Sequence, residues 1–173
     1  MSNEADATGR VDPPLAGSEL EMLDSFLDYH RATLLWKVRG VGDEDLRRSS
    51  VPTSTMTLLG LVKHLAYVER SWFQHRFKND NVTFPWTKED PDADWRIEPD
   101  ETTEGILRLY DEECEKSRQI VAAASLDEKA ARSWPDGNSP TLRWIMYHMI
   151  EETARHNGHA DLLREAVDGA TGE

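Results

Sequence analysis

The chain has 173 residues and a formal net charge of −13, with 38% apolar and 31% charged residues. This length favours one domain with a substantial core. So many carboxylates repel phosphate backbones, which argues against a nucleic-acid-binding protein. No apolar run approaches the roughly 18 residues that a membrane span needs, so no membrane partner is expected. Cys114 is the single cysteine, which excludes an intramolecular disulfide and is typical of a reducing compartment.

The first 15 residues are polar and lack the basic and apolar regions of a signal peptide. We therefore expect a cytoplasmic protein with a flexible leader over residues 1–15. One helical domain is expected over residues 16–168, followed by a short tail over residues 169–173.

The first two predicted helices follow from capping residues and apolar spacing. Ser18 and Glu21 have the spacing of a capping box, and the helix that they begin should end before Gly40. The second helix is predicted over residues 57–77, because apolar side chains recur there at helical spacing.

The other two helices complete an all-α fold. The third is predicted after Asp100. The fourth should begin with Ser139 as N-cap and Pro140 as the first helical residue, and end near Val167. No alternation of apolar and polar residues predicts a strand. The sequence therefore predicts a four-helix bundle.

A long connection over residues 78–99 joins the second and third helices. It contains Trp86 and Trp95 and is long enough to cross the whole bundle and join two parallel helices. The two tryptophans either anchor the loop to the core or form a lid over a substrate.

Three residues have the chemistry of a metal site. Glu152 and His156 are four residues apart, so they lie on one face of the fourth helix. His64 lies on the inner face of the second helix and would supply a third ligand. A helical ion pair between Glu152 and His156, and a hydrogen-bonded core position for His64, are the simpler interpretations of the spacing.

Further residues are candidates for the surroundings of this site. A ligating histidine usually donates its second N–H to a carboxylate or carbonyl, and a nearby imidazole can carry protons near neutral pH. Gly158 either allows a neighbouring backbone to approach or has no special role. The candidates for outer contacts or pocket walls, each with packing or a surface position as the alternative, are Glu69, Trp72, His148, Arg155, His159 and Asp161.

Residues 57–69 and 151–161 carry a family resemblance that extends over nearly the whole chain after the leader. The chain resembles the DinB-like superfamily of metal-binding four-helix bundles, in the branch with mycothiol-dependent enzymes. Most of that superfamily uses three histidines. Glu152 replaces one of them, which is similar to the His, Glu, His pattern of mycothiol-dependent maleylpyruvate isomerase and mycothiol S-transferases. The resemblance implies His64, Glu152 and His156 as metal ligands and favours zinc, although another divalent ion is also compatible.

No side chain stands out as a nucleophile, so a low-molecular-weight thiol is the natural candidate. Zinc deprotonates a bound thiol, and the thiolate is the reactive form. The resemblance implies a mycothiol S-transferase, a monomer or homodimer, that acts on a small electrophile in detoxification or secondary metabolism. The alternatives are a maleylpyruvate-type isomerase, a non-enzymatic metal-binding stress or scaffold protein, and a non-haem iron oxygenase.

Overall fold

The computed structural model describes Asp6 and residues 8–171; residues 1–5 and 7 of the predicted leader and 172–173 of the predicted tail lie outside this part. The described residues form helices and no strand, with one isolated bridge between Lys129 and Thr141. The all-α prediction is therefore confirmed. The elements in chain order are α1 (Glu19–Val38), α2 (Asp43–Leu46), α3 (Leu58–Glu69), the π-helix η1 (Arg70–Lys78), α4 (Thr103–Ala122) and α5 (Leu142–Asp168).

The chain divides into two compact units. The first consists of Met1–Leu58 and Met146–Glu173, and the second of Leu59–Ile145. The first unit contains α1, α2 and most of α5, while the second contains α3, η1, α4 and the long connections. No helix in the described part of the chain is long and apolar enough to cross a membrane.

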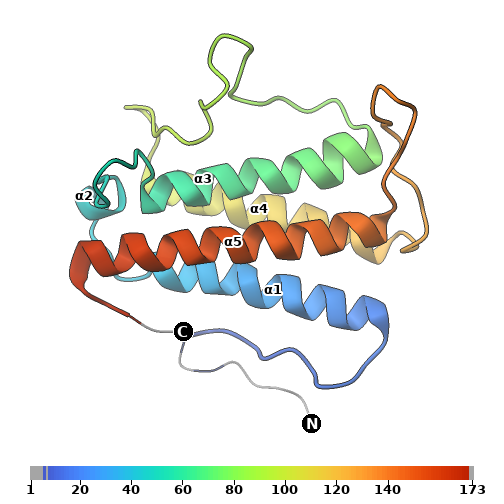
Figure 1. Cartoon of the computed structure of the whole chain (residues 1–173), viewed down its shortest axis with the longest axis horizontal. Coiled ribbons are helices and arrows are strands. Elements are labelled where there is room, and N and C mark those ends of the chain that lie inside the picture. Colours follow the sequence, from blue (N-terminus) through green and yellow to red (C-terminus); the bar gives the residue numbers. More distant parts are fainter. Residues whose placement is uncertain (1–5, 7, 172–173) are drawn as a thin grey trace. The chain divides into compact units, whose positions relative to one another are not determined.

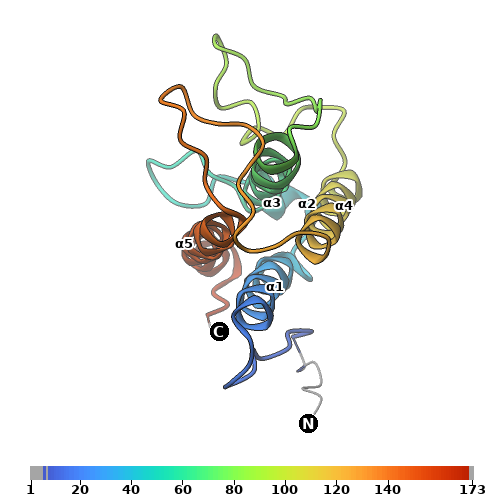
Figure 2. The ribbon, with the colours of Figure 1, turned by 90° about the vertical axis from the view of Figure 1, so that its right-hand side faces the viewer.

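In the first unit, α1 and α5 lie side by side and run in the same direction (Figures 1 and 2). The Nδ2 of Asn157 donates to the carbonyl of His30 at 3.0 Å. One turn further along α5, Asp161 forms an ion pair with Lys37 of α1 at 2.5 Å. The Nη1 of Arg164 donates to the Lys37 carbonyl at 2.9 Å. These contacts fix the rotation of α5 against α1, and therefore which face of α5 remains for the predicted site.

Arg10, within the predicted leader, is attached to α1. Its guanidinium lies over the rings of Tyr29 and Trp36, with 5.1 and 4.6 Å between its Cζ and the two ring centroids. Such cation–π contacts stabilise by about 0.5–2 kcal/mol each. This part of the leader therefore packs on the helix, whereas the flexibility of the leader as a whole stays a prediction.

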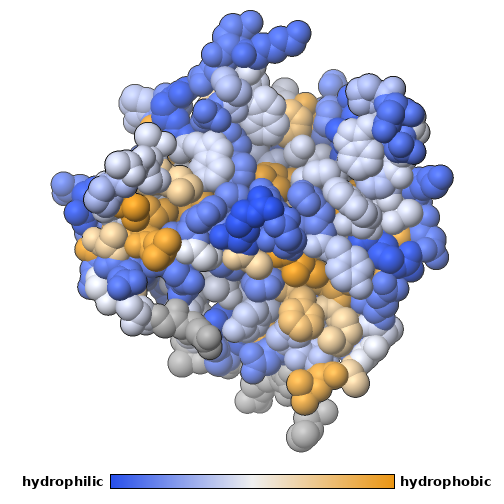
Figure 3. Space-filling model, viewed as in Figure 1, coloured by the Kyte–Doolittle hydropathy of each residue, from blue (hydrophilic) through white to orange (hydrophobic). Residues whose placement is uncertain are grey.

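An apolar groove of about 280 Å³ follows the surface of α1 and α5 in the first unit. Its walls include Met22, Phe26, Tyr147 and Ile150. Figure 3 shows apolar surface over the beginning of α1, at the lower right of the view. Phe26 is one of the periodic apolar residues of α1, yet it is 41% exposed, so the apolar stripe of α1 is wider than the face that it buries.

In the second unit, α3 and η1 run parallel to α4 (Figure 1). Arg70 and Gln74 of η1 both donate to the carboxylate of Glu113 on α4. Because two parallel neighbours need a connection as long as the helices, residues 79–102 return along the pair. The predicted long crossover between the second and third helices is thus present.

The helix starts test the capping predictions. Ser18 is the N-cap of α1, and both hydrogen bonds of its capping box with Glu21 are present. The predicted start of the fourth helix is wrong, because α5 begins at Leu142. The carbonyl of Pro140 accepts a hydrogen bond from Ala130, and Thr141 pairs with Lys129, so this stretch is bound to a neighbouring segment before the helix begins.

The second predicted helix extends from Leu58 to Lys78, but its last nine residues form the π-helix η1. Asn79, at φ 59°, ends it in the left-handed conformation that asparagine tolerates. A π-helix is rare and is frequently found at functional sites, which draws attention to the residues beside η1.

Candidate metal centre

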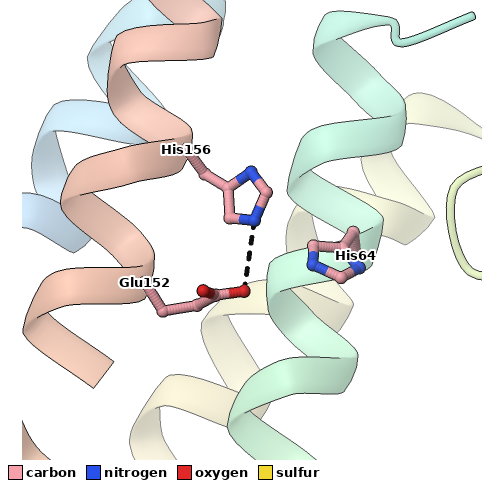
Figure 4. A group of neighbouring side chains, drawn as sticks. All are labelled: His64, Glu152 and His156. Carbon is pink, nitrogen blue, oxygen red and sulfur yellow. Dashed lines mark hydrogen bonds and ion pairs between the residues drawn. The ribbon is translucent and has the colours of Figure 1, made fainter. Parts of the chain in front are cut away.

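Glu152 and His156 lie on successive turns of α5, with their side chains on one side of the helix (Figure 4). The Nε2 of His156 is 3.2 Å from the Oε1 of Glu152. The side chains are only 8% and 15% exposed, respectively. A carboxylate and an imidazole are thus held together where water has limited access, as the spacing of four residues predicted.

Both side chains have a second contact on the same helix. The Nη1 of Arg155 donates to the Oε2 of Glu152 at 3.1 Å. The Nδ1 of His159 is 3.2 Å from the Nδ1 of His156. Burial, together with the charges of His156 and Arg155, holds the pKa of His159 below its ordinary value of 6.5. The contact with His159 engages the Nδ1 of His156, so the Nε2, which faces the Glu152 carboxylate, is the nitrogen at which a cation could replace a proton.

His64 of α3 is held by two consecutive residues of the long connection. Its Nδ1 is 2.8 Å from the Oδ2 of Asp94. Its ring stacks on the indole of Trp95 with 3.8 Å between centroids and 16° between planes. The hydrogen bond and the stacked ring together define both the position and the plane of the imidazole.

Lys63, the neighbour of His64, is a buried cation that the sequence analysis did not single out. Its Nζ donates to the carbonyls of Ala93 at 3.3 Å and Arg96 at 2.7 Å, and to the Oε2 of Glu101 at 2.8 Å. Its side chain is 2% exposed. Lys63 and His64 therefore bind the same short segment, residues 93–96, from adjacent positions of α3.

His64, Glu152 and His156 form a group suited to a metal ion: each offers one ligand atom, and these atoms lie within 4.8 Å of one another (Figure 4). Two imidazoles and one carboxylate are a donor set found in catalytic zinc sites and in non-haem iron enzymes. The residues present therefore fit a divalent cation. Their role as ligands stays a prediction.

Two other predicted site residues have partners of their own. Asp161 forms its ion pair with Lys37 of α1, so its carboxylate stabilises helix packing. The Nδ1 of His148, a half-buried side chain, lies 3.8 Å from the Oε2 of Glu151 on the same helix. The ion pair favours the simpler interpretation of Asp161, whereas the pocket role of His148 stays a prediction.

The remaining predicted pocket residues are Glu69 and Trp72. Glu69 is the last residue of α3 and is buried, with 1% of its surface exposed. The ring of Trp72 lies 5.5 Å from that of Trp144, which in turn lies 5.8 Å from Trp134. Trp72 thus belongs to a cluster of three tryptophans in the second unit, and its role as a pocket wall stays a prediction.

Asp94 is the residue beside His64 that sequence reasoning missed. It stands in Asp92-Ala93-Asp94-Trp95, among several acidic residues of a loop, and no periodic pattern distinguishes it from its neighbours. The one available signal was Trp95, because an aromatic side chain in a polar loop indicates a packed segment.

The model of the mycothiol-S-transferase family matches residues 22–169. The chain belongs to this family. The family is DinB-like, so the resemblance seen in the sequence is confirmed. No curated protein matches the chain.

Among solved structures, this chain is similar to the crystal structure of a conserved protein from Enterococcus faecalis. The TM-score is 0.62 and the sequence identity 14%, and the match covers 90% of this chain and 100% of the other. At this identity the similarity concerns the fold alone.

Proposed function

We propose that this protein is a metal-dependent S-transferase that uses mycothiol, with His64, Glu152 and His156 as ligands of a divalent cation. The observation that carries the proposal is the approach of three ligand atoms to within 4.8 Å of one another in a chain of this family. The family supports the thiol, and the donor set supports the ion.

Zinc is the ion that we expect from the family resemblance, and two histidines with one carboxylate would leave one of its coordination positions open. When bound, it supplies a positive charge that favours the thiolate form of a thiol. In a substitution, the sulfur of mycothiol would form a bond to a carbon of the electrophile as the bond from that carbon to its leaving group breaks. The leaving group would depart with the electron pair, and the thiol proton would pass to solvent. The electrophile would be a small molecule encountered in detoxification or secondary metabolism, and we expect the reaction in the cytoplasm.

The chain's own residues hold and orient the site. A carboxylate in partial burial is costly unless it is paired, and the guanidinium of Arg155 offsets part of that cost for Glu152. His159 contacts the Nδ1 of His156, which leaves the Nε2 beside Glu152 as the nitrogen that would donate its lone pair to the ion. None of these groups is arranged as a nucleophile with an adjacent base, which agrees with a nucleophile supplied by the co-substrate.

The direct test measures conjugation of mycothiol to a thiol-reactive fluorogenic dye by the zinc-loaded protein. We expect His64→Ala, Glu152→Gln and His156→Ala each to reduce the rate to that of the dye and thiol alone. Glu165→Gln is the matched control on α5, because the Glu165 side chain is exposed, and it should keep the wild-type rate. Metal content is measured on each variant before the assay.

Three results would contradict the proposal. Full turnover by a metal-free ligand variant would remove the ion from the reaction. Recovery of unchanged mycothiol together with an isomerised acid, when maleylpyruvate-type acids are supplied, would identify an isomerase instead. Absence of both activities, with no shift in melting temperature on addition of mycothiol, would favour a non-enzymatic protein.

A further inference from the structure

One carboxylate of the long connection is buried against a predicted metal ligand. Asp94 is 5% exposed, and an ionised carboxylate so buried requires a hydrogen-bond donor. In the part of the chain that the structure describes, the donor is His64, whose Nδ1 lies 2.8 Å from the Oδ2 of Asp94. The contact joins residues thirty positions apart, so it depends on how the connection folds back on α3.

The chemistry of this contact selects one tautomer of His64. An ionised carboxylate can only accept, so the Nδ1 of His64 must carry the proton. A neutral imidazole with the proton on Nδ1 has its lone pair on Nε2. A metal ligand needs that lone pair, and a carboxylate on the opposite nitrogen also makes the ligand more basic.

Two further contacts keep the carboxylate in place. Trp95 stacks on the His64 ring and restricts its rotation. Lys63 binds the carbonyls of Ala93 and Arg96, on either side of Asp94 and Trp95. The backbone that carries Asp94 is thus fixed to α3 at a position adjacent to the ligand.

We propose that Asp94 is the positioning residue of His64: it fixes the tautomer with the proton on Nδ1 and directs Nε2 to the metal. The proposal rests on the proposed function for the identity of the ion, but its effect on His64 precedes any ion. Asp94 contacts neither metal nor substrate in this scheme and acts through His64 alone.

An alternative role for Asp94 is simple attachment of the connection. Lys63 already supplies three hydrogen bonds to that segment and its neighbour Glu101, so attachment does not require a carboxylate at His64. The two roles differ in a measurable way. An attachment residue changes stability, whereas a positioning residue changes the protonated nitrogen of His64 and the affinity for metal.

The first measurement concerns the metal-free protein. Long-range ¹H–¹⁵N spectra of histidine-labelled protein at a fixed neutral pH report which ring nitrogen carries the proton, and the signals of His64 are those lost in His64→Gln. We expect the Nδ1–H form in the wild type. We expect a shift toward the Nε2–H form in Asp94→Ala, whereas Asp94→Asn should retain the Nδ1–H form through its amide oxygen. Asp92→Ala, an exposed neighbour, should leave the spectrum unchanged.

The second measurement is zinc affinity by competition with a chromogenic chelator. Loss of an outer carboxylate typically weakens metal binding 10–100-fold, and we expect a loss of about this size in Asp94→Ala. The loss should be smaller in Asp94→Asn, and Asp92→Ala should bind as the wild type does.

The outcomes separate the two proposals. If Asp94→Ala keeps the Nδ1–H form and binds zinc within two-fold of the wild type, Asp94 has no positioning role. If the tautomer changes as expected but the wild type binds no metal, the positioning of His64 stands and the metal-dependent function fails. If Asp94→Ala does not fold, the zinc affinity of Asp94→Asn decides: binding as tight as that of the wild type in this variant overturns the assignment.

Discussion

Each predicted ligand has a hydrogen-bond partner outside the group of three ligands, and each partner would help its ligand to bind a metal. For the two histidines the partner occupies the nitrogen that the metal does not need, and for the carboxylate it is a cation that favours the ionised form. The three pairs differ in how far apart in sequence the partners lie. The pairs are His64 with Asp94, Glu152 with Arg155, and His156 with His159.

Gly158 lies on the exposed side of α5 between these pairs. A Cβ added at Gly158 would have no described atom within 4 Å, apart from those of its chain neighbours and the nearby backbone of α5 itself. The idea that it allows close approach of a neighbouring backbone is therefore wrong. Glycine within a helix costs about 1 kcal/mol relative to alanine. We expect Gly158→Ala to raise the free energy of unfolding by about that amount, measured by urea denaturation. Destabilisation would contradict this account.

The sequence could identify the ligand candidates on α5 because helical periodicity relates residues 152, 156 and 159 directly. It could not identify Asp94, because its position opposite His64 depends on the path of a connection without periodicity. Asp161 follows His156 by five residues, which is not the spacing of one helix face, and it pairs with Lys37 of α1. Spacing within one helix was therefore predictable, and contacts between segments were not.

At the scale of elements, η1 and α4 are joined through one buried carboxylate. Glu113 is completely buried and accepts hydrogen bonds from Arg70 and Lys116, both at 2.8 Å, and from Gln74. Both residues of η1 in this network lie four apart in the π-helix. The π-helix thus turns two polar side chains toward α4, and a carboxylate bound by three donors offsets the cost of placing them there.

Glu113 should therefore make stability depend on pH. Burial by itself raises the pKa of Glu113, but hydrogen bonds from Arg70, Lys116 and Gln74 outweigh it and hold the pKa below its ordinary value of 4.5. A group with a lowered pKa stabilises the fold above its ordinary pKa, and this contribution is lost as pH falls through the folded-state value.

We expect Glu113→Gln to lower the free energy of unfolding at pH 7 by about 3 kcal/mol, because it leaves Arg70 without its buried partner. Its stability should also fall less steeply than that of the wild type as pH decreases below 4.5. Glu112→Gln is the control, since that side chain is 57% exposed, and it should change stability little. Equal acid sensitivity in wild type and Glu113→Gln would contradict the assignment.

Lys63 should govern how firmly the long connection is held. Replacement by methionine preserves the apolar stem but removes the donor to two carbonyls and to Glu101, which leaves buried acceptors unsatisfied at a cost of about 2 kcal/mol. We expect Lys63→Met to increase the rate of tryptic cleavage after Arg96 roughly ten-fold or more. Lys129→Met, an exposed position, should not. Unchanged cleavage would mean that other contacts hold residues 93–96.

Helix starts illustrate what the sequence decides at this scale. Ser18 and Glu21 satisfy each other within one turn, so their capping box was predictable from four residues. Ser139 and Pro140 are equally favourable residues for a helix start, as N-cap and first helical residue. Pro140 and Thr141 nevertheless pair with residues 129–130. The π-helix was unpredictable for a related reason, since its apolar spacing over a few residues resembles that of an α-helix.

At the scale of the whole molecule, the predicted ligands come from positions 64, 152 and 156 of a chain with net charge −13. All three side chains can bind one ion only in the folded protein, because almost ninety residues separate His64 from Glu152 along the chain. The binding free energy of the ion therefore adds to the free energy of unfolding. The negative charge of the molecule attracts cations to its surface in general. A specific site is therefore shown only when substitution of a ligand abolishes zinc binding.

Zinc should raise the melting temperature of this protein through that linkage. At a free concentration 100 times the dissociation constant, the gain is about 2.7 kcal/mol, or roughly 5–10 °C for a chain of this size. We expect zinc to raise the melting temperature of Glu152→Gln and His156→Ala much less than that of the wild type. Glu165→Gln should show the wild-type increase. Because imidazoles must be neutral to bind a metal, the rise in melting temperature should shrink as the pH is lowered. A rise of the same size in the ligand variants would assign it to surface charge and exclude the proposed centre.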